Sequence, residues 1–209
     1  VFNVEAMMLY KWLNVSVGYK YLKDVMEWTK YIYPGKEFAY NTSLNFDHKQ
    51  LLYASVNVSP KFGIFRPTWG FNYNQQFFDT RKYGAGKALS KPLLSCSLDN
   101  NFALSETMNA AISLNAATSN ADGFLMMKSY YSVDLRFDKS FANRTWIIYL
   151  SANDIFKTAK ERWTMYGLGS DTIKDCYNYT RSISLQVTYN FNAKRSKYKG
   201  TGAGNEEKS

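Results

Sequence analysis

Histidine and cysteine are almost missing from this sequence, which has one histidine, His48, and two cysteines, Cys96 and Cys176. A structural zinc site needs about four ligands, and these three residues lie far apart without CxxC spacing. We therefore expect no metal site and no cofactor. We expect Cys96 to pack as a small apolar side chain and Cys176 to lie in a long loop. A disulfide between them is neither required nor excluded.

The scarcity of histidine also bears on catalysis. A Ser–His–acid triad would have to use His48, which belongs to the polar stretch 45–50 that we place in an external loop. The sequence has no GxSxG motif of the α/β-hydrolase type. No other catalytic set of side chains stands out, so we expect a protein that is not an enzyme.

Long hydrophobic runs are missing as well. The longest uninterrupted apolar segments, Ala6–Tyr10 and Trp146–Leu150, are five residues long. A membrane-spanning helix needs about 20 apolar residues, and the mean hydropathy of this chain is −0.40. The sequence therefore argues against a helical membrane protein.

No arginine-rich run or nucleic-acid-binding motif accompanies the formal charge of +9. Five of the cations fall within residues 192–209, and the others are scattered along the chain. We therefore expect no nucleic-acid partner. Residues 192–209 also lose the pattern of the preceding sequence and become rich in Lys, Gly and Ser, so we predict a disordered tail.

What the sequence does contain is a regular alternation of apolar and polar residues, which places one set of side chains on each face of a β-strand. In residues 12–21, for example, Leu13 and Val15 alternate with Asn14 and Ser16. The pattern predicts about nine strands and no amphipathic helix. The predicted strands lie at 1–10, 12–21, 52–59, 68–77, 91–104, 108–115, 131–137, 144–152 and 182–191.

The predicted connections alternate between short and long. Short ones fall near 10–12, 61–66, 104–107 and 138–143, and long ones near 22–48, 79–90, 118–124 and 153–178. Short turns at one end and long loops at the other are typical of antiparallel up-and-down barrels of the outer membrane. The two longest connections contain β-like stretches, so we expect their flanking strands to extend beyond the bilayer. We interpret 1–191 as a barrel portion and 192–209 as a flexible tail.

Alternation alone does not separate a membrane barrel from a soluble all-β binding domain, which stays open as an alternative. The polar faces carry Asn, Ser, Thr, Gln and Gly rather than the Lys and Glu that cover water-exposed strands. Aromatic residues, 17% of the chain, gather near strand ends, where a lipid-embedded barrel has its interfacial girdles. The sequence therefore favours an all-β transmembrane barrel. Because single-chain bacterial barrels have even strand numbers, about nine strands predict a portion of a larger barrel.

Two groups of residues are candidates for function. Lys20, Asp134 and Arg136 lie on predicted polar faces, and we place them in the lumen. Asp134 and Arg136 are neighbours on one strand face, where they form either a space-filling salt bridge or a charge cluster that tunes passage. Aromatic residues of the two longest loops either contact a ligand or brace one another. They are Trp28, Tyr31, Tyr33, Trp163, Tyr166 and Tyr177.

Several motifs follow one another in order along the C-terminal half of the chain. They are NFAL at 101–104, the strand 109–117, VDLRFDKS at 133–140, NDIF at 153–156 and TYNF at 188–191. In this order and spacing the chain resembles the outer-membrane β-barrel family found at the C-terminus of TonB-dependent-receptor-like proteins. The resemblance covers most of the chain and is less distinct before about residue 90.

This resemblance implies a location in the outer membrane, contact with its lipid and lipopolysaccharide, and a larger barrel of about 22 strands that is closed by a plug. It also implies nutrient uptake driven by the TonB system, with a surface lipoprotein as a further partner. Neither a plug nor a TonB-contacting segment occurs in this sequence, so we interpret the chain as the C-terminal part of such a receptor. A structural or adhesion barrel without transport is the alternative.

Overall fold

The computed structural model describes residues 1–32, 35, 38–81, 89–169 and 171–191. Within these residues all the regular secondary structure is β-strand, and the strands form two antiparallel sheets. The predicted tail, 192–209, lies outside the described residues. The nine-stranded sheet contains β1 (Phe2–Tyr10), β2 (Leu13–Ile32), β3 (Ala39–Val58), β4 (Phe65–Phe77), β5 (Leu93–Ser105), β6 (Met108–Ala117), β9 (Tyr130–Phe141), β10 (Trp146–Asn153) and β13 (Ser182–Tyr189). The four-stranded sheet contains β7 (Asn120–Asp122), β8 (Leu125–Met127), β11 (Lys160–Met165) and β12 (Thr172–Tyr177).

The large sheet confirms the predicted up-and-down arrangement. Its strands pair in the order β1-β2-β3-β4-β5-β6-β9-β10-β13, so every strand lies beside the one that precedes it in that sheet. The skipped strands belong to the small sheet, which interrupts the meander twice at the same end. Among the described residues the large sheet is open, with β1 and β13 as its edges.

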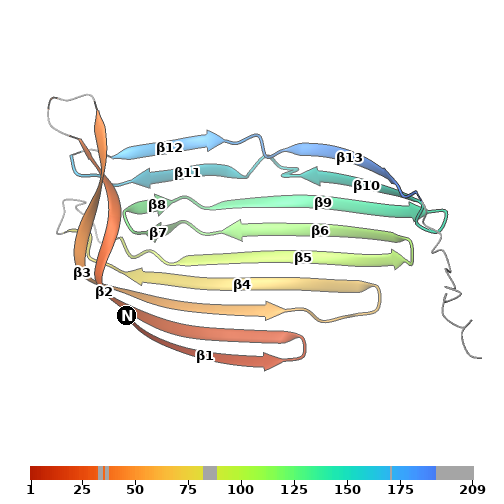
Figure 1. The fold of residues 1–209 in the computed structure, drawn as a ribbon, viewed down its shortest axis with the longest axis horizontal. Helices are drawn as coiled ribbons and strands as arrows, with labels where there is room; N and C mark the ends of the chain where they lie inside the picture. The colour runs from red at the N-terminus through yellow and green to blue at the C-terminus, as the bar shows by residue number, and fades with distance from the viewer. Residues whose placement is uncertain (33–34, 36–37, 82–88, 170, 192–209) are drawn as a thin grey trace, which may run out of the picture.

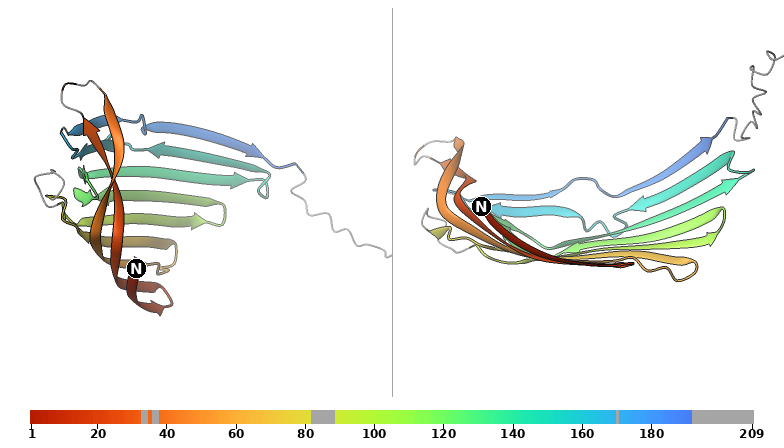
Figure 2. Two further views of the ribbon diagram at one scale, coloured as in Figure 1. Left: turned by 60° about the vertical axis from the view of Figure 1, so that its left-hand side comes forward. Right: turned by 60° about the horizontal axis from the view of Figure 1, so that its bottom comes forward.

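The sheet is curved into a trough with two different ends (Figures 1 and 2). Short turns join the strands at one end. At the other end, the distal parts of β2 and β3 twist across the mouth of the trough toward the small sheet (Figure 2). We call this long-loop end the loop cap; it comprises the described residues of 22–50, 78–91, 118–129 and 154–181.

Strand register sorts the side chains of the large sheet into two faces. Residues directly opposite each other in antiparallel strands share a face, so a row of partners can be followed across the sheet. One such row contains Leu13, Val58, Trp69, Leu98, Leu114 and Val133. The next row contains Asn14, Asn57, Gly70, Ser97, Asn115 and Ser132. The predicted alternation is therefore kept in register over six strands.

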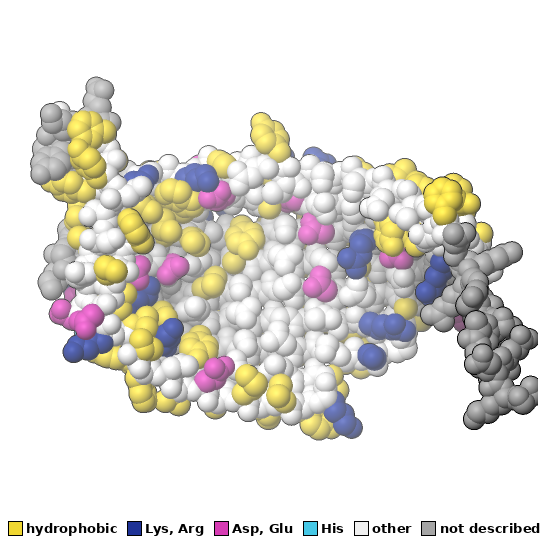
Figure 3. Space-filling view, in the orientation of Figure 1, with side chains coloured by type: hydrophobic (Ala, Val, Ile, Leu, Met, Phe, Trp, Pro, Cys, Tyr) yellow, Lys and Arg dark blue, Asp and Glu magenta, His cyan; other side chains and the backbone are white. Residues whose placement is uncertain are grey.

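The two faces differ in shape as well as in chemistry. The centre of the concave face carries almost no hydrophobic side chains (Figure 3). Apolar rows occupy the convex face, where Val17, Leu185 and Val187 are 48%, 67% and 55% exposed. A soluble all-β domain would bury these residues against other protein. The exposed rows argue against the alternative of a soluble domain.

The two longest predicted connections are mostly strand. β2 and β3 are 20 residues each and run through most of 22–48, while β11 and β12 occupy parts of 153–178. The extension of the flanking strands is thus as predicted, but His48 lies in β3 rather than in a loop. Its ring stacks on Tyr21 at 5.6 Å. The reason is that pairing between β2 and β3 continues past the polar stretch, with Lys23 opposite His48.

Candidate functional site at the long-loop end of the concave face

Small polar side chains satisfy one another across the concave face. Ser16 and Ser55 hydroxyls lie 2.9 Å apart, and Ser97 donates to Asn115 Oδ1 at 2.9 Å. A further hydroxyl pair, Ser151 and Ser184, lies at 2.6 Å. Such groups need no apolar partner and can face water, so they suit a polar lumen.

The charges predicted for the lumen all lie on this polar side. Lys20 is in the row of Asn3, Asp134 in that of Ser113, and Arg136 in that of Asn101, through Ala111. Any role of these charges in passage stays a prediction.

The predicted Asp134–Arg136 salt bridge is wrong. Arg136 Nη2 donates to Asn101 Oδ1 at 3.2 Å, while Asp134 Oδ1 accepts from the backbone N–H of Asp154 at 2.7 Å. Arg136 thus reaches across Ala111 to β5, and Asp134 bonds to the main chain directly after β10.

The loop cap has a compact core of its own. Phe46, Phe78 and Phe124 are buried together, with the rings of Phe46 and Phe78 4.3 Å apart. Hydrogen bonds connect the hairpin formed by the distal parts of β2 and β3 to the segment that follows β11. Thr29 Oγ1 donates to Tyr166 O at 3.1 Å. Tyr166 N in turn donates to Phe124 O at 3.0 Å. The cap is thus a folded unit rather than a set of independent loops.

One buried cation stands at the junction between cap and trough. Lys49 Nζ lies 2.6 Å from Glu27 Oε1 and 3.6 Å from Asp122 Oδ1, and only 8% of the Lys49 side chain is exposed. It also lies over the Phe78 ring at 5.3 Å. Beside it, Gln76 accepts from Gly123 N at 2.9 Å. Three separate connections are therefore held at this point.

Two adjoining cavities lie beside this junction on the concave side. The smaller, of about 380 Å³, includes Lys49, Leu51, Asn74, Gln76 and Asp122 in its lining. The larger, of about 500 Å³, includes Leu125, Met127, Glu161, Trp163 and Met165. The two cavities share Asn120, Met127 and Tyr130. An apolar and aromatic pocket therefore leads toward the polar centre of the trough, and such a lining with a few polar groups is typical of ligand sites.

Of the aromatic residues predicted to contact a ligand, Trp163 is the one that lines these cavities among those described. Its indole N–H donates to Glu161 Oε1 at 2.9 Å. Trp28 lies in β2 and is 68% exposed, Tyr31 forms a bridge with Leu168, and Tyr33 lies outside the described residues. Tyr166 braces the cap through its main chain, as given above. The prediction that these residues bind a ligand remains a prediction.

Glu161 fixes the wall of the larger cavity. It accepts hydrogen bonds from Lys174 at 2.7 Å, from Asn178 Nδ2 at 3.0 Å and from Trp163. These bonds, with that from Lys174 first, lower the pKa of Glu161 from 4.5 to about 2. The carboxylate is therefore ionised across the physiological range, and the indole has a fixed acceptor.

The residue that sequence reasoning missed is Asp154, which is 2% exposed and lies directly after β10. Its carboxylate accepts from Thr158 N at 2.8 Å, from Thr180 Oγ1 at 2.7 Å and from Tyr177 OH at 3.2 Å. Burial raises the pKa of Asp154, but the hydrogen bonds from Thr180, Thr158, Ala159 and Tyr177 outweigh it and lower the pKa below its usual value. The second residue of the NDIF motif thus organises the connection that carries Trp163, and Tyr177 serves it as a brace.

Both cysteines are free thiols in the structure. Cys96 lies in the apolar row of Val56, Phe71 and Ala116, as predicted. Cys176 is in β12 rather than in a loop, and its thiol donates to Asn178 Oδ1 at 2.8 Å. Within the described part of the chain, no group of three or more His, Cys, Asp or Glu side chains could hold a metal ion.

Residues 2–189 match the model of the outer membrane protein beta-barrel family. The chain belongs to this family. A search of curated proteins and a search of solved structures each found no match. The family places the protein in the cell outer membrane, with lipid and lipopolysaccharide around it, so the exposed apolar rows of the convex face are the lipid-facing surface of the barrel.

The two ends of the barrel can be assigned to the two sides of the membrane. Outer-membrane barrels have short periplasmic turns and longer extracellular loops, which puts the loop cap and its cavities on the outer side. No helix among the described residues is long and apolar enough to cross a membrane.

Proposed function

We propose that this barrel segment belongs to a TonB-dependent-receptor-like protein that takes up a nutrient across the outer membrane. The observation that carries the proposal is the pair of adjoining cavities at the outer end. A ligand held against Trp163 and Met127 would lie at the entrance to the polar face of the trough. It would enter the lumen once a plug moved.

Three features of the site support uptake over a closed structural role. The larger cavity, about 500 Å³, has the size of a small-molecule site. Its tryptophan is held by Glu161 before any ligand arrives, so little side-chain ordering is needed on binding. The concave face beyond it is lined by small polar groups that carry their own hydrogen-bond partners. The proposal gives the chain no catalytic role.

The TonB system and a surface lipoprotein are the partners that this proposal requires. Energy from TonB would have to reach a plug, and a lipoprotein would have to meet the loop cap from outside. Both are inferred from the resemblance of the NDIF and TYNF motifs rather than from a contact in the structure.

The test is growth of a strain that lacks the full-length protein on media in which one nutrient at a time is limiting. We expect a defect on one class of nutrient, restored by the wild-type protein and poorly by Trp163→Ala. Trp28→Ala, which changes an exposed tryptophan away from the cavities, is the matched control and should restore growth. The same defect should appear when TonB is absent. Full growth on every nutrient tested would contradict the proposal.

A second candidate, a structural or adhesion barrel without transport, is favoured by one observation. Met26 and Trp28 are 69% and 68% exposed on the hairpin of the loop cap, and exposed apolar patches mark interaction surfaces. If this role holds, Met26→Ser with Trp28→Ser should reduce attachment of cells to a surface, and nutrient-limited growth should be unchanged in the deletion strain.

A further inference from the structure

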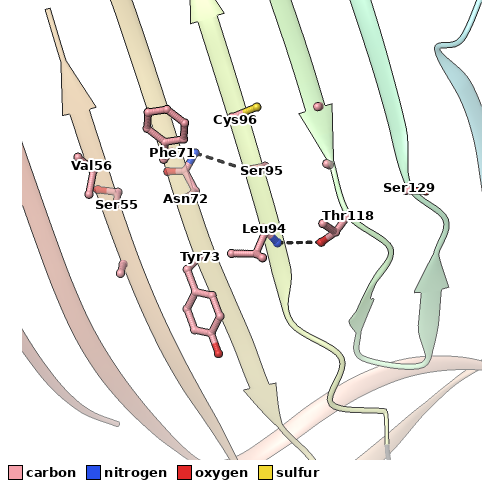
Figure 4. Close-up of a pocket in the computed structure, with 13 residues that line it drawn as sticks. Ser55, Val56, Phe71, Asn72, Tyr73, Leu94, Ser95, Cys96, Thr118 and Ser129 are labelled. Atoms are coloured by element: carbon pink, nitrogen blue, oxygen red, sulfur yellow. Dashed lines mark hydrogen bonds between the residues drawn. The ribbon is translucent and has the colours of Figure 1, made fainter.

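The convex face has a hollow that the transport proposal does not use. It lies over β3, β4, β5 and β6, has a volume of about 500 Å³, and its surface is almost entirely apolar. Bulky side chains stand beside small ones there, so the face is recessed where the small ones lie (Figure 4). The bulky residues are Phe71, Tyr73 and Leu94, and the small ones are Ala54, Cys96 and Ala116.

The hollow lies on the lipid side of the barrel. Its residues Val56, Phe71, Cys96 and Ala116 form one row of the register, and that row has the parity of the exposed apolar rows. Leu94 in its wall is 53% exposed. A groove at this place faces the hydrocarbon chains of the membrane.

Cations gather where the groove meets the loop cap. Its lining ends there at Thr118 and Ser129. Arg162 Nη2 donates to the carbonyl oxygen of Ser129 at 3.0 Å, and Lys128, the residue before Ser129, donates its backbone N–H to Arg162 O at 2.9 Å. On the other side Lys91 donates to Ser119, which follows Thr118. The side chains of Arg162 and Lys91 thus lie at the outer end of the apolar groove.

Arg162 is also incompletely satisfied. Its Nε is the one buried side-chain nitrogen or oxygen without a hydrogen-bond partner among the described residues. Asp175 lies opposite Arg162 in β12, but the two side chains do not form an ion pair within the described part of the chain. Alternation in β11 puts the Arg162 side chain on the strand face opposite Trp163, although Arg162 also contributes to the lining of the larger cavity.

We propose that this groove and its rim form a binding site for one phosphorylated, acylated lipid of the outer leaflet. An acyl chain lies in the groove, between Phe71 and Leu94 and over Ala116. The phosphate accepts hydrogen bonds from Arg162, with Lys128 and Lys91 adding charge. Charge and apolar surface meet at the outer end of the barrel wall, where the headgroups of the outer leaflet lie. The site rests on the family membership and the geometry, and it is independent of nutrient uptake.

The test is native mass spectrometry of the full-length protein in detergent, titrated with diphosphorylated lipid A and separately with its dephosphorylated form. We expect the diphosphorylated lipid to bind about tenfold more tightly, because charge-assisted hydrogen bonds to phosphate are lost from the other. Arg162→Gln should remove this difference. Ala116→Trp should fill the groove and weaken both lipids by about tenfold.

Ala110→Trp is the matched control, since Ala110 lies on the same face of β6 toward the short-turn end, in the row of Phe102 and Phe137. It should bind both lipids as the wild-type protein does. Heat-dependent mobility on gels confirms that each variant has folded. Equal weakening by Ala110→Trp and Ala116→Trp, or equal affinity of the wild-type protein for the two lipids, would overturn the proposal and indicate ordinary annular lipid.

Discussion

The large sheet and the loop cap differ in where they place their apolar side chains. In the sheet, apolar side chains such as Leu185 stay 67% exposed, whereas in the cap Phe124 is 2% exposed. The sheet is built for a hydrocarbon solvent that covers its convex face. The cap lies in water and has to make a core from its own phenylalanines. Apolar side chains are therefore exposed to lipid in the sheet and buried within the protein in the cap. The boundary between the two regions lies near residues 22 and 50, where the hairpin of β2 and β3 leaves the sheet.

The largest effect expected from this difference is that of Phe124→Ala. Truncating a buried phenylalanine costs about 3–5 kcal/mol, and here the loss should be confined to the cap, where Phe124 packs on Phe46 and Phe78. Hydrogen exchange should show faster opening of β8 and β11 with unchanged protection in β4 and β5. Phe71→Ala, on the lipid-facing side, is the control: lipid can fill the space left by the ring, so protection should change little. Equal effects of the two variants would refute the distinction.

An arginine placed in the sheet should destabilise the protein more on the lipid-facing side than on the polar face. Arg at the bilayer midplane on the lipid-facing side costs about 2–4 kcal/mol, so Leu114→Arg should lower the midpoint of urea unfolding in detergent or lipid. Asn115→Arg, one residue further along β6, points to the polar face and loses one bond from Ser97. That loss is worth about 1 kcal/mol. If the two arginines cost the same, the assignment of the faces is wrong.

This difference between sheet and cap explains which parts of the fold the sequence predicts. Alternation is local information, and it predicts the nine strands of the sheet and their polar and apolar faces because one face meets lipid. It weakens at Lys23 and Asp24, where Asp24 has a left-handed φ of 55°. Beyond this point the sequence predicts only a connection with β-like stretches, whereas β2 continues to Ile32. The small sheet has strands of 3 to 6 residues, which are too short for a clear period.

The site shows the same limit. The sequence indicates Trp163 because aromatic residues in connections are frequent anchors. Its cavity, however, is made by segments 40 residues apart in sequence, such as Asn120 and Lys160. Asp154 could have been suspected from its place in NDIF, yet its partners Thr158, Tyr177 and Thr180 come from both ends of the following connection. Long-range contacts of this kind leave no periodic signal.

Asp154→Asn tests whether charge or shape holds that connection. Asparagine tolerates the left-handed φ of 44° at this position, so the backbone is retained while the carboxylate is lost. Hydrogen bonds to a charged group are worth about 1.5–3 kcal/mol, and hydrogen exchange in β11 and β12 should accelerate by the corresponding factor. Asp171→Asn, an exposed aspartate of the same connection, is the control and should leave exchange unchanged. Unaltered exchange in Asp154→Asn would show that the charge contributes nothing.

The smallest effect concerns acid, and it should again separate the cap from the sheet. Because the bonds from Lys174, Asn178 and Trp163 lower the pKa of Glu161 from 4.5 to about 2, the folded cap binds fewer protons than the unfolded cap between these values. Its contribution to stability is complete above pH 4.5 and is lost as the pH falls toward about 2.

Hydrogen exchange in β11 and β12, corrected for the intrinsic pH dependence of exchange, should therefore accelerate over this range. The lowered pKa of Asp154 acts in the same direction, so Glu161→Gln should remove only part of the dependence. The amides of Gly70–Asn74 in β4 and Leu93–Ser97 in β5 provide the internal reference, because the polar side chains paired there are uncharged Asn and Ser. If β4 and β5 lose protection in parallel with β11 and β12, the cap and the sheet open as one unit. The distinction between a lipid-facing sheet and a separately folded cap in water is then wrong.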